Sequence, residues 1–213
     1  MSNLIVLIVL SIASLVFLWI IRRKGNKAEA LSFLSTMIAT LFGVLLAITL
    51  SDRSNKTKEV SDTIKLLKSA SNILDRTHVY VIGLETYIQS LEKDSLKISE
   101  ERLIEIKKNN PVPYPQLMEK IVSNEIIAKN LSDYTHNRIF TELINLQKIS
   151  SYGSLPIYKR TLKELSLLFS LEEEFQKGVL TEPALIYNFE QGRKELAEQY
   201  PIGSSTTIWE TRE

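Results

Sequence analysis

Two long uncharged stretches at the start of the chain dominate its hydrophobic pattern. Residues 4–21 contain no charged side chain, and neither do residues 30–50. As helices they would be about 27 Å and about 31 Å long, close to the roughly 30 Å hydrocarbon core of a bilayer. The pattern predicts a two-helix transmembrane hairpin over residues 1–51, with a short cationic loop between the spans.

A cleavable signal peptide is the competing interpretation of residues 4–21. No basic segment precedes the stretch, no small-residue cleavage pattern comes before Arg22, and the stretch is longer than the apolar region of a usual signal. Basic residues next to membrane spans are enriched on the cytoplasmic side. The lysines and arginines after residue 50 slightly outnumber those of the loop, which favours a cytoplasmic C-terminal part, whereas the dense Arg22-Arg23-Lys24 favours a cytoplasmic loop. We expect the C-terminal part to lie on the cytoplasmic side.

The second span carries small and hydroxylated residues at spacings of three and four, which places them on one helical face. They are Ser32, Thr36, Thr40 (or Ala39), Gly43 and Ala47. Small residues let helices approach closely in lipid, so this face can be a packing seam within the hairpin or between copies of the chain. The alternative is the hydroxyl-lined wall of a pore in a homo-oligomer. Asp52 and Arg53, just beyond the span, would then form charged rings at the pore mouth, or else only a local salt bridge.

A seven-residue apolar repeat begins at Val60 and predicts a long connecting helix over residues 52–98. The first heptad position holds Val60, Leu67, Leu74, Val81 and Ile88, the position three later holds Thr63, Ala70, Thr77, Leu84 and Leu91, and the flank holds Leu66, Ile73, Tyr80 and Tyr87. Such a broad stripe is typical of a helix in a bundle or coiled coil. No proline or glycine separates it from the second span, so the two can form one continuous helix.

The rest of the chain predicts a helical soluble domain over residues 99–200 and a mobile tail over residues 201–213. No segment alternates with period two, so the expected fold is all-α. Expected helix starts are Ser99, Ser132-Asp133 and Thr181 with Pro183, and expected breaks are the prolines at 111, 113 and 115, the turn 153–156 and Gly178. The proline stretch is interpreted as a loop, with a Pro-rich ligand for a recognition domain as the alternative. The last helix is expected to bury Leu185, Tyr187 (or Ile186), Phe189 and Leu196.

Composition excludes several chemistries. The chain has no cysteine and two histidines, which excludes a disulfide framework, a thiol nucleophile and a His-rich metal centre. With 26 basic and 25 acidic residues, general binding of duplex nucleic acid is not expected. No Gly-rich phosphate loop, zinc-protease motif or nucleophile elbow is present, so we expect no enzyme activity, catalytic residue, cofactor or metal site. The acidic run 172–174 is interpreted as a solvated helix face.

Two basic clusters are candidates for binding a small anion. Tyr134, His136 and Arg138 lie within five positions, and a second cluster near the start of a later helix holds Lys159, Arg160 and Lys163. Cationic groups beside aromatic platforms suit a nucleotide or a short oligonucleotide. The alternative is that both clusters are ordinary solvated faces.

The segment LSFLSTMIATLFGVLLAITLSDR, residues 31–53, resembles a span of the form LATLxGVLLAxxLDR that occurs in many small bacterial membrane proteins. Two N-terminal spans followed by a small helical domain are similar to membrane effectors of bacterial anti-phage systems. In several of those effectors the soluble domain senses a nucleotide signal and the membrane part assembles into a pore. The resemblance implies a homo-oligomeric, channel-forming effector of the bacterial inner membrane, gated by a ligand or partner. A membrane-tethered scaffold without a pore is the alternative.

Overall fold

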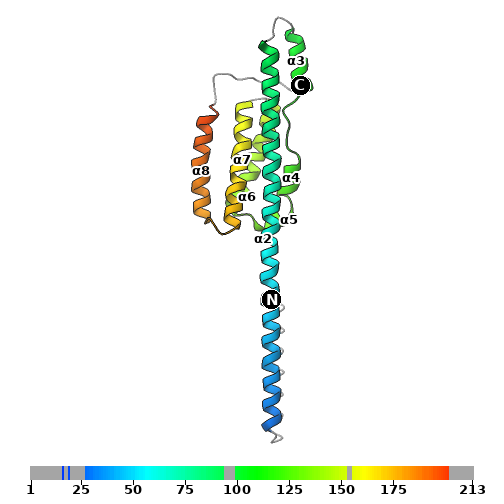
Figure 1. Cartoon of the computed structure of the whole chain (residues 1–213), viewed down its shortest axis with the longest axis vertical. Helices are drawn as coiled ribbons and strands as arrows, with labels where there is room; N and C mark the ends of the chain where they lie inside the picture. The colour runs from blue at the N-terminus through cyan, green and yellow to red at the C-terminus, as the bar shows by residue number, and fades with distance from the viewer. Residues whose placement is uncertain (1–15, 17–18, 20–26, 94–98, 153–154, 202–213) are drawn as a thin grey trace. The chain divides into compact units, whose positions relative to one another are not determined.

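The computed structural model describes residues 16, 19, 27–93, 99–152 and 155–201. Within these ranges the chain is all-α, as predicted, and has no strand. The helices are α2 (Lys27–Lys93), α3 (Glu100–Asn109), α4 (Leu117–Val122), α5 (Glu125–Asn130), α6 (Asp133–Tyr152), α7 (Leu155–Gln176) and α8 (Glu182–Gln199) (Figure 1). The chain divides into an N-terminal unit, Met1–Thr57, and a helical unit, Lys58–Glu213, and α2 contributes to both.

The described part of the N-terminal unit shows one long apolar helix, not the predicted two-helix hairpin. The predicted first span lies outside the described residues except for Val16 and Trp19, which are helical. The predicted second span lies within α2, which continues to Lys93 because no proline or glycine interrupts residues 51–82. Among the described helices, α2 alone is long and apolar enough to cross a membrane, a property that a signal sequence can share.

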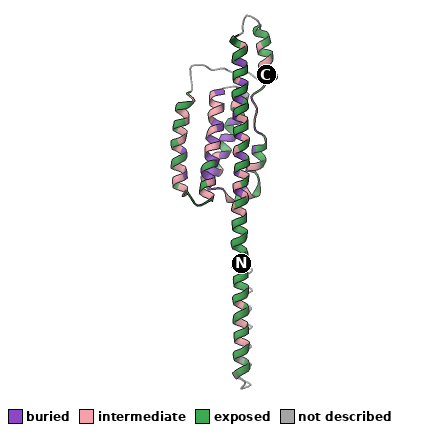
Figure 2. Ribbon diagram, viewed as in Figure 1, coloured by how far each residue is buried: buried purple, intermediate pink, exposed green. Residues whose placement is uncertain are grey.

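The apolar part of α2 in the N-terminal unit is exposed (Figure 2). Leu31 exposes 74% of its surface, Phe42 71% and Leu46 63%. Each large apolar side chain left in water forgoes about 1.5–3 kcal/mol of burial free energy. An apolar surface of this extent is typical of a segment that contacts lipid or other protein chains.

The part of α2 that belongs to the helical unit supplies one wall of the hydrophobic core. The predicted heptad residues Leu67, Ala70, Leu74, Val81, Leu84 and Ile88 are all buried. The flanking tyrosines are an exception, because Tyr80 and Tyr87 are 53% and 50% exposed. The core is instead widened on the opposite flank, where the buried His78 lies and Ser71 meets Ser166 of α7 with 3.2 Å between their hydroxyl oxygens.

The predicted start of α3 and the predicted proline loop are both present. The Ser99 hydroxyl accepts a hydrogen bond from the Arg102 backbone N–H at 3.3 Å, which caps α3. The loop that follows packs on the helical unit, because Val112 is buried and the hydroxyl of the fully buried Tyr158 donates to the Pro113 carbonyl. This packing favours a structural loop over an exposed Pro-rich ligand.

The ends of the last two helices differ from the predictions in detail. Pro156 lies in the first turn of α7, where its missing N–H leaves no helical bond unmade, and not in a turn before the helix. Gly178 has φ +73° after the end of α7, as a glycine C-cap requires. Thr181 precedes α8 without a side-chain cap bond, and Ile186 packs on the core while Tyr187 is exposed.

Glu172 is fully buried, so the prediction of a solvated face over residues 172–174 is wrong for this residue. Its carboxylate accepts hydrogen bonds from the Ser132 backbone N–H at 3.0 Å and from the Ser132 hydroxyl at 2.8 Å. Ser132 immediately precedes α6, so Glu172 satisfies an N–H at the N-terminus of that helix. Glu173 is half-buried and pairs with Lys177 and with Lys68 of α2, whereas Glu174 is exposed, as the prediction requires.

Candidate functional site

The small-residue face of α2 is exposed at every position. Ser32, Thr36, Thr40, Gly43 and Ala47 are all exposed, whereas Phe33, Met37 and Leu41 on the neighbouring face are half-buried. A Cβ added at Gly43 would meet no atom within 4 Å. Within the described part of the chain the face therefore has no packing partner.

The threonine hydroxyls of this face are already hydrogen-bonded to the backbone. Thr36 donates to the Ser32 carbonyl at 3.0 Å, and Thr40 donates to the Thr36 carbonyl at 2.8 Å. A hydroxyl bonded one turn back can lie in apolar surroundings without an unsatisfied donor. Asp52 and Arg53 are exposed in α2, and among the described residues no ion pair joins them.

The six predicted ligand residues do not form one cluster. Arg138 of α6 and Arg160 of α7 line the same groove between these helices. Tyr134 is turned toward α8, where its hydroxyl donates to Glu190 at 2.9 Å, and His136 stacks edge-on against Phe140. The remaining two residues, Lys159 and Lys163, face α2.

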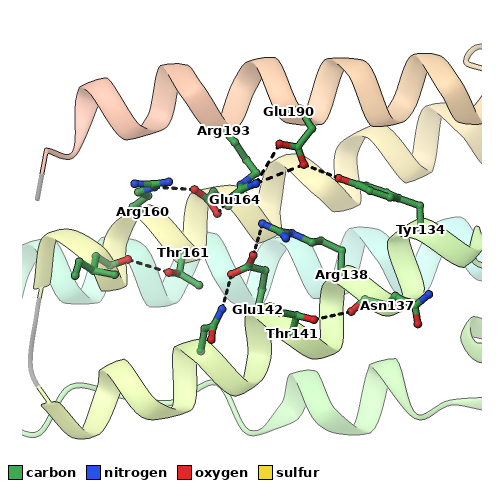
Figure 3. A network of polar contacts seen from close by, with 12 residues as sticks. Tyr134, Asn137, Arg138, Thr141, Glu142, Arg160, Thr161, Glu164, Glu190 and Arg193 are labelled. Carbon is green, nitrogen blue, oxygen red and sulfur yellow. Dashed lines mark hydrogen bonds and ion pairs between the residues drawn. The ribbon is translucent and has the colours of Figure 1, made fainter.

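Three arginines and two buried glutamates form the polar network of the groove (Figure 3). Arg138 bonds Glu142 at 2.8 Å within α6, and Arg160 bonds Glu164 at 2.7 Å within α7. Arg193 of α8 joins them, with its Nε 3.4 Å from the second oxygen of Glu164. Both glutamates are buried, so their charges are neutralised mainly by these guanidinium groups.

Four residues of this network were not predicted from the sequence: Glu142, Glu164, Glu190 and Arg193. Spacings of four residues for Arg138–Glu142 and Arg160–Glu164 are a signal for helical ion pairs that could have identified the first two. The contact of Arg193 with Glu164 joins α8 to α7, and local spacing contains no signal for it.

Charges at the edge of this network shift the pKa of three groups. Burial, then the hydrogen bond to Glu190 and its charge, raises the pKa of Tyr134 to about 12. Burial alone would raise the pKa of Glu190, but the Tyr134 hydrogen bond and the charges of Arg193 and Arg138 bring it below its ordinary value. Burial alone would lower the pKa of Arg193, but the carboxylates around it, Glu164 first, raise it.

The two lysines that face α2 surround His78. Lys159 bonds Glu85 at 2.6 Å, Lys163 lies 3.5 Å from Asp75, and the Tyr200 hydroxyl lies 3.3 Å from His78 Nε2. Burial, followed by the charges of Lys163 and Lys159, lowers the pKa of His78, although Asp75 opposes the shift. The lowered pKa favours the uncharged imidazole, whose ring contacts Tyr200 edge-on at the end of α8.

In the part of the chain that the structure describes, no group of three or more His, Asp or Glu side chains could hold a metal ion. The groove with its three arginines is therefore the candidate ligand site, and the exposed face of α2 is the candidate association site. Comparisons of the chain with protein-family models, with curated proteins and with solved structures found no match.

Proposed function

We propose that the chain is a homo-oligomeric membrane effector whose helical unit controls how its apolar helices associate. The observation that carries the proposal is the continuity of α2. This one helix contains an apolar segment of membrane-spanning length and, further along, the buried residues Leu67, Leu74 and Val81. A change in the packing of the core therefore acts on the same helix that would enter the bilayer.

Two features of the N-terminal unit support insertion and self-association. Exposed side chains such as Leu31 and Phe42 are stable in lipid and costly in water. The exposed small-residue face, with open space at Gly43, permits the close helix approach on which association in lipid depends. In a homo-oligomer the partner at this face would be the same face of a second copy of the chain.

The resemblance of residues 30–53 to spans of small bacterial membrane proteins extends the proposal to its setting. The effector would lie in the bacterial inner membrane with its helical unit in the cytoplasm, and it would act in anti-phage defence. When the helical unit binds its ligand or partner, the assembled α2 helices would open a pore. Asp52 and Arg53 would line the mouth of that pore.

The test compares assembly and leakage for two matched variants. Gly43→Leu adds bulk on the small-residue face, whereas Leu45→Phe adds bulk on the opposite side of the same helix, two residues away. Light scattering of the full chain in detergent should show an oligomer for the wild type and for Leu45→Phe, and smaller species for Gly43→Leu. Dye leakage from liposomes at high protein density should follow the same order. A monomeric wild type, or a Gly43→Leu variant that assembles normally, would contradict the proposal.

A membrane-tethered scaffold is the second candidate, and the threonine geometry favours it. Because Thr36 and Thr40 satisfy their hydroxyls on the backbone, the face needs no water beside it. The scaffold hypothesis predicts no leakage at any protein density. It also predicts that exchanging residues 1–51 for an unrelated hairpin leaves partner binding unchanged, whereas the effector hypothesis predicts loss of function.

A further inference from the structure

The groove between α6 and α7, which is also lined by Arg193 of α8, has a volume of about 510 Å³. This volume lies within the range of about 300–1,000 Å³ that is usual for small-molecule sites. Most of its lining residues carry polar or charged groups, and the lining consists of Arg138, Thr141, Glu142, Asn145, Lys148, Ile149, Ile157, Arg160, Thr161, Glu164 and Arg193. A small polar molecule is the kind of occupant that fits such a lining.

The charge of the lining favours an anion. Three arginines and Lys148 outnumber the two carboxylates, Glu142 and Glu164. Both carboxylates are buried and already engaged by guanidinium groups, while Lys148 is exposed and has no ion pair among the described residues. Arg193 is also paired with Glu190, 3.1 Å away and outside the lining, so one positive charge of the group remains for an incoming anion to neutralise.

Unused donors on the arginines point the same way. Arg160 uses only Nε toward Glu164, so the two Nη groups of its guanidinium have no partner in the described chain. Nε of Arg138 is buried and lacks a hydrogen bond among the described residues, and Nε of Arg193 lies at ion-pair distance from Glu164, 3.4 Å, without hydrogen-bond geometry. A buried donor without an acceptor is destabilising, so an oxyanion that accepts from these side chains would be stabilising.

The lining also limits the class of anion. Its apolar members are Ile149 and Ile157, and it contains no aromatic ring on which a nucleobase could stack. Tyr134, the aromatic residue expected to serve as a platform, is bonded to Glu190 and does not line the groove. The groove therefore offers recognition of phosphate oxygens and little recognition of a base.

We propose that this groove binds a small soluble ligand carrying two or more linked phosphate groups, held through Arg138, Arg160, Arg193 and Lys148. Arg160 and Arg193 would turn part of their donors from Glu164 to the phosphates. Because Glu164 joins α7 to α8, the ligand would change the packing of α7. α7 contacts α2 through the Lys159–Glu85 ion pair at 2.6 Å, so the change in the packing of α7 would be transmitted to α2. The role of this phosphate ligand as the signal for the effector rests on the proposed function, but binding of the ligand to the groove does not.

The experiment measures binding of sodium tripolyphosphate to the full chain in detergent by titration calorimetry at fixed salt. We expect saturable binding that weakens at least tenfold in Lys148→Glu, which breaks no ion pair and should leave the fold intact. Lys120→Glu reverses the charge of a lysine on α4 that is also exposed, and this variant should bind like the wild type. Arg160→Gln should also weaken binding at least tenfold, with circular dichroism confirming that it is folded.

Several outcomes would overturn the inference. Two of them are the absence of saturable binding and an equal loss of tripolyphosphate affinity in Lys120→Glu and Lys148→Glu. A third is binding of adenosine triphosphate more than tenfold tighter than that of tripolyphosphate, because the groove has no aromatic platform for a base. Binding only to vesicles of anionic lipid, and not to free tripolyphosphate, would assign the cations to a headgroup and reject a soluble ligand. If the chain binds tripolyphosphate but stays monomeric, the anion-binding groove is supported and the homo-oligomeric effector is rejected. If the chain assembles into an oligomer but does not bind tripolyphosphate, only the anion-binding groove is rejected.

Discussion

Replacing Glu172 by alanine is expected to lower the stability of the helical unit by about 3–5 kcal/mol. The fully buried carboxylate accepts hydrogen bonds from the backbone N–H and hydroxyl of Ser132 and, at 2.8 Å, from the Gln176 amide. Alanine leaves these donors without that acceptor, at about 1–3 kcal/mol for each one that stays buried. Part of the loss is offset because the carboxylate no longer has to be desolvated.

Thermal unfolding of the full chain in detergent, followed by far-UV circular dichroism, measures this effect. For a chain of this size 1 kcal/mol corresponds to about 2–4 °C, so Tm should fall by roughly 6–20 °C. Glu174→Ala is the matched control, because its exposed side chain lies two residues away and its removal should change stability by less than about 0.5 kcal/mol. Glu172→Gln keeps one acceptor oxygen and should fall between the two. Equal Tm values for Glu172→Ala and Glu174→Ala would refute the assignment of a capping role.

Three further predictions follow from local geometry. Gly178→Ala should lower the free energy of unfolding by about 1 kcal/mol, because φ is +73° while an added Cβ meets no atom within 4 Å. Gly178→Asn should lower it by less, and equal stability of the wild type and both variants in thermal unfolding would contradict a left-handed cap. Tyr134→Phe should raise the pKa of Glu190 in an NMR titration of the carboxyl, since a hydrogen bond that lowers this pKa is lost; an unchanged pKa would be inconsistent with the contact. Because the pKa of His78 is lowered in the folded state, stability should be complete above about pH 6.5 and should decline as the pH falls below that value toward the folded pKa. The His78→Gln variant should show a flatter Tm between about pH 7.5 and about pH 5.5, and an unchanged slope would count against this assignment.

Only some residues of the candidate groove could be predicted from the sequence, and their grouping into one site could not. Arg138 and Arg160 were both identified from the sequence, but as members of two separate clusters. Local spacing indicates which acid each arginine meets on its own helix. It contains no information on the packing of α6, α7 and α8, which brings Arg193 to Glu164 and turns Tyr134 away from the groove. The nucleotide platform expected at Tyr134 and His136 therefore has no counterpart in the groove lining.

The sequence by itself determined the features that depend on neighbours along the chain. These are the all-α class, the long apolar stretch, the cap at Ser99, the break at Gly178 and the heptad positions of Leu67, Leu74 and Val81. Each follows from backbone sterics, capping or helical periodicity, which act over a few residues.

Only the tertiary structure decided which side of each helix is covered. Periodicity places His78 and Tyr80 on opposite flanks of one stripe, and the position of α7 buries the first and exposes the second. The same holds for Glu172 and Glu174, since an acidic side chain is buried where a neighbouring helix end supplies donors and stays in water where none does. Burial of a polar group depends on partners that are distant in the chain, and those partners are specified only when the helices pack.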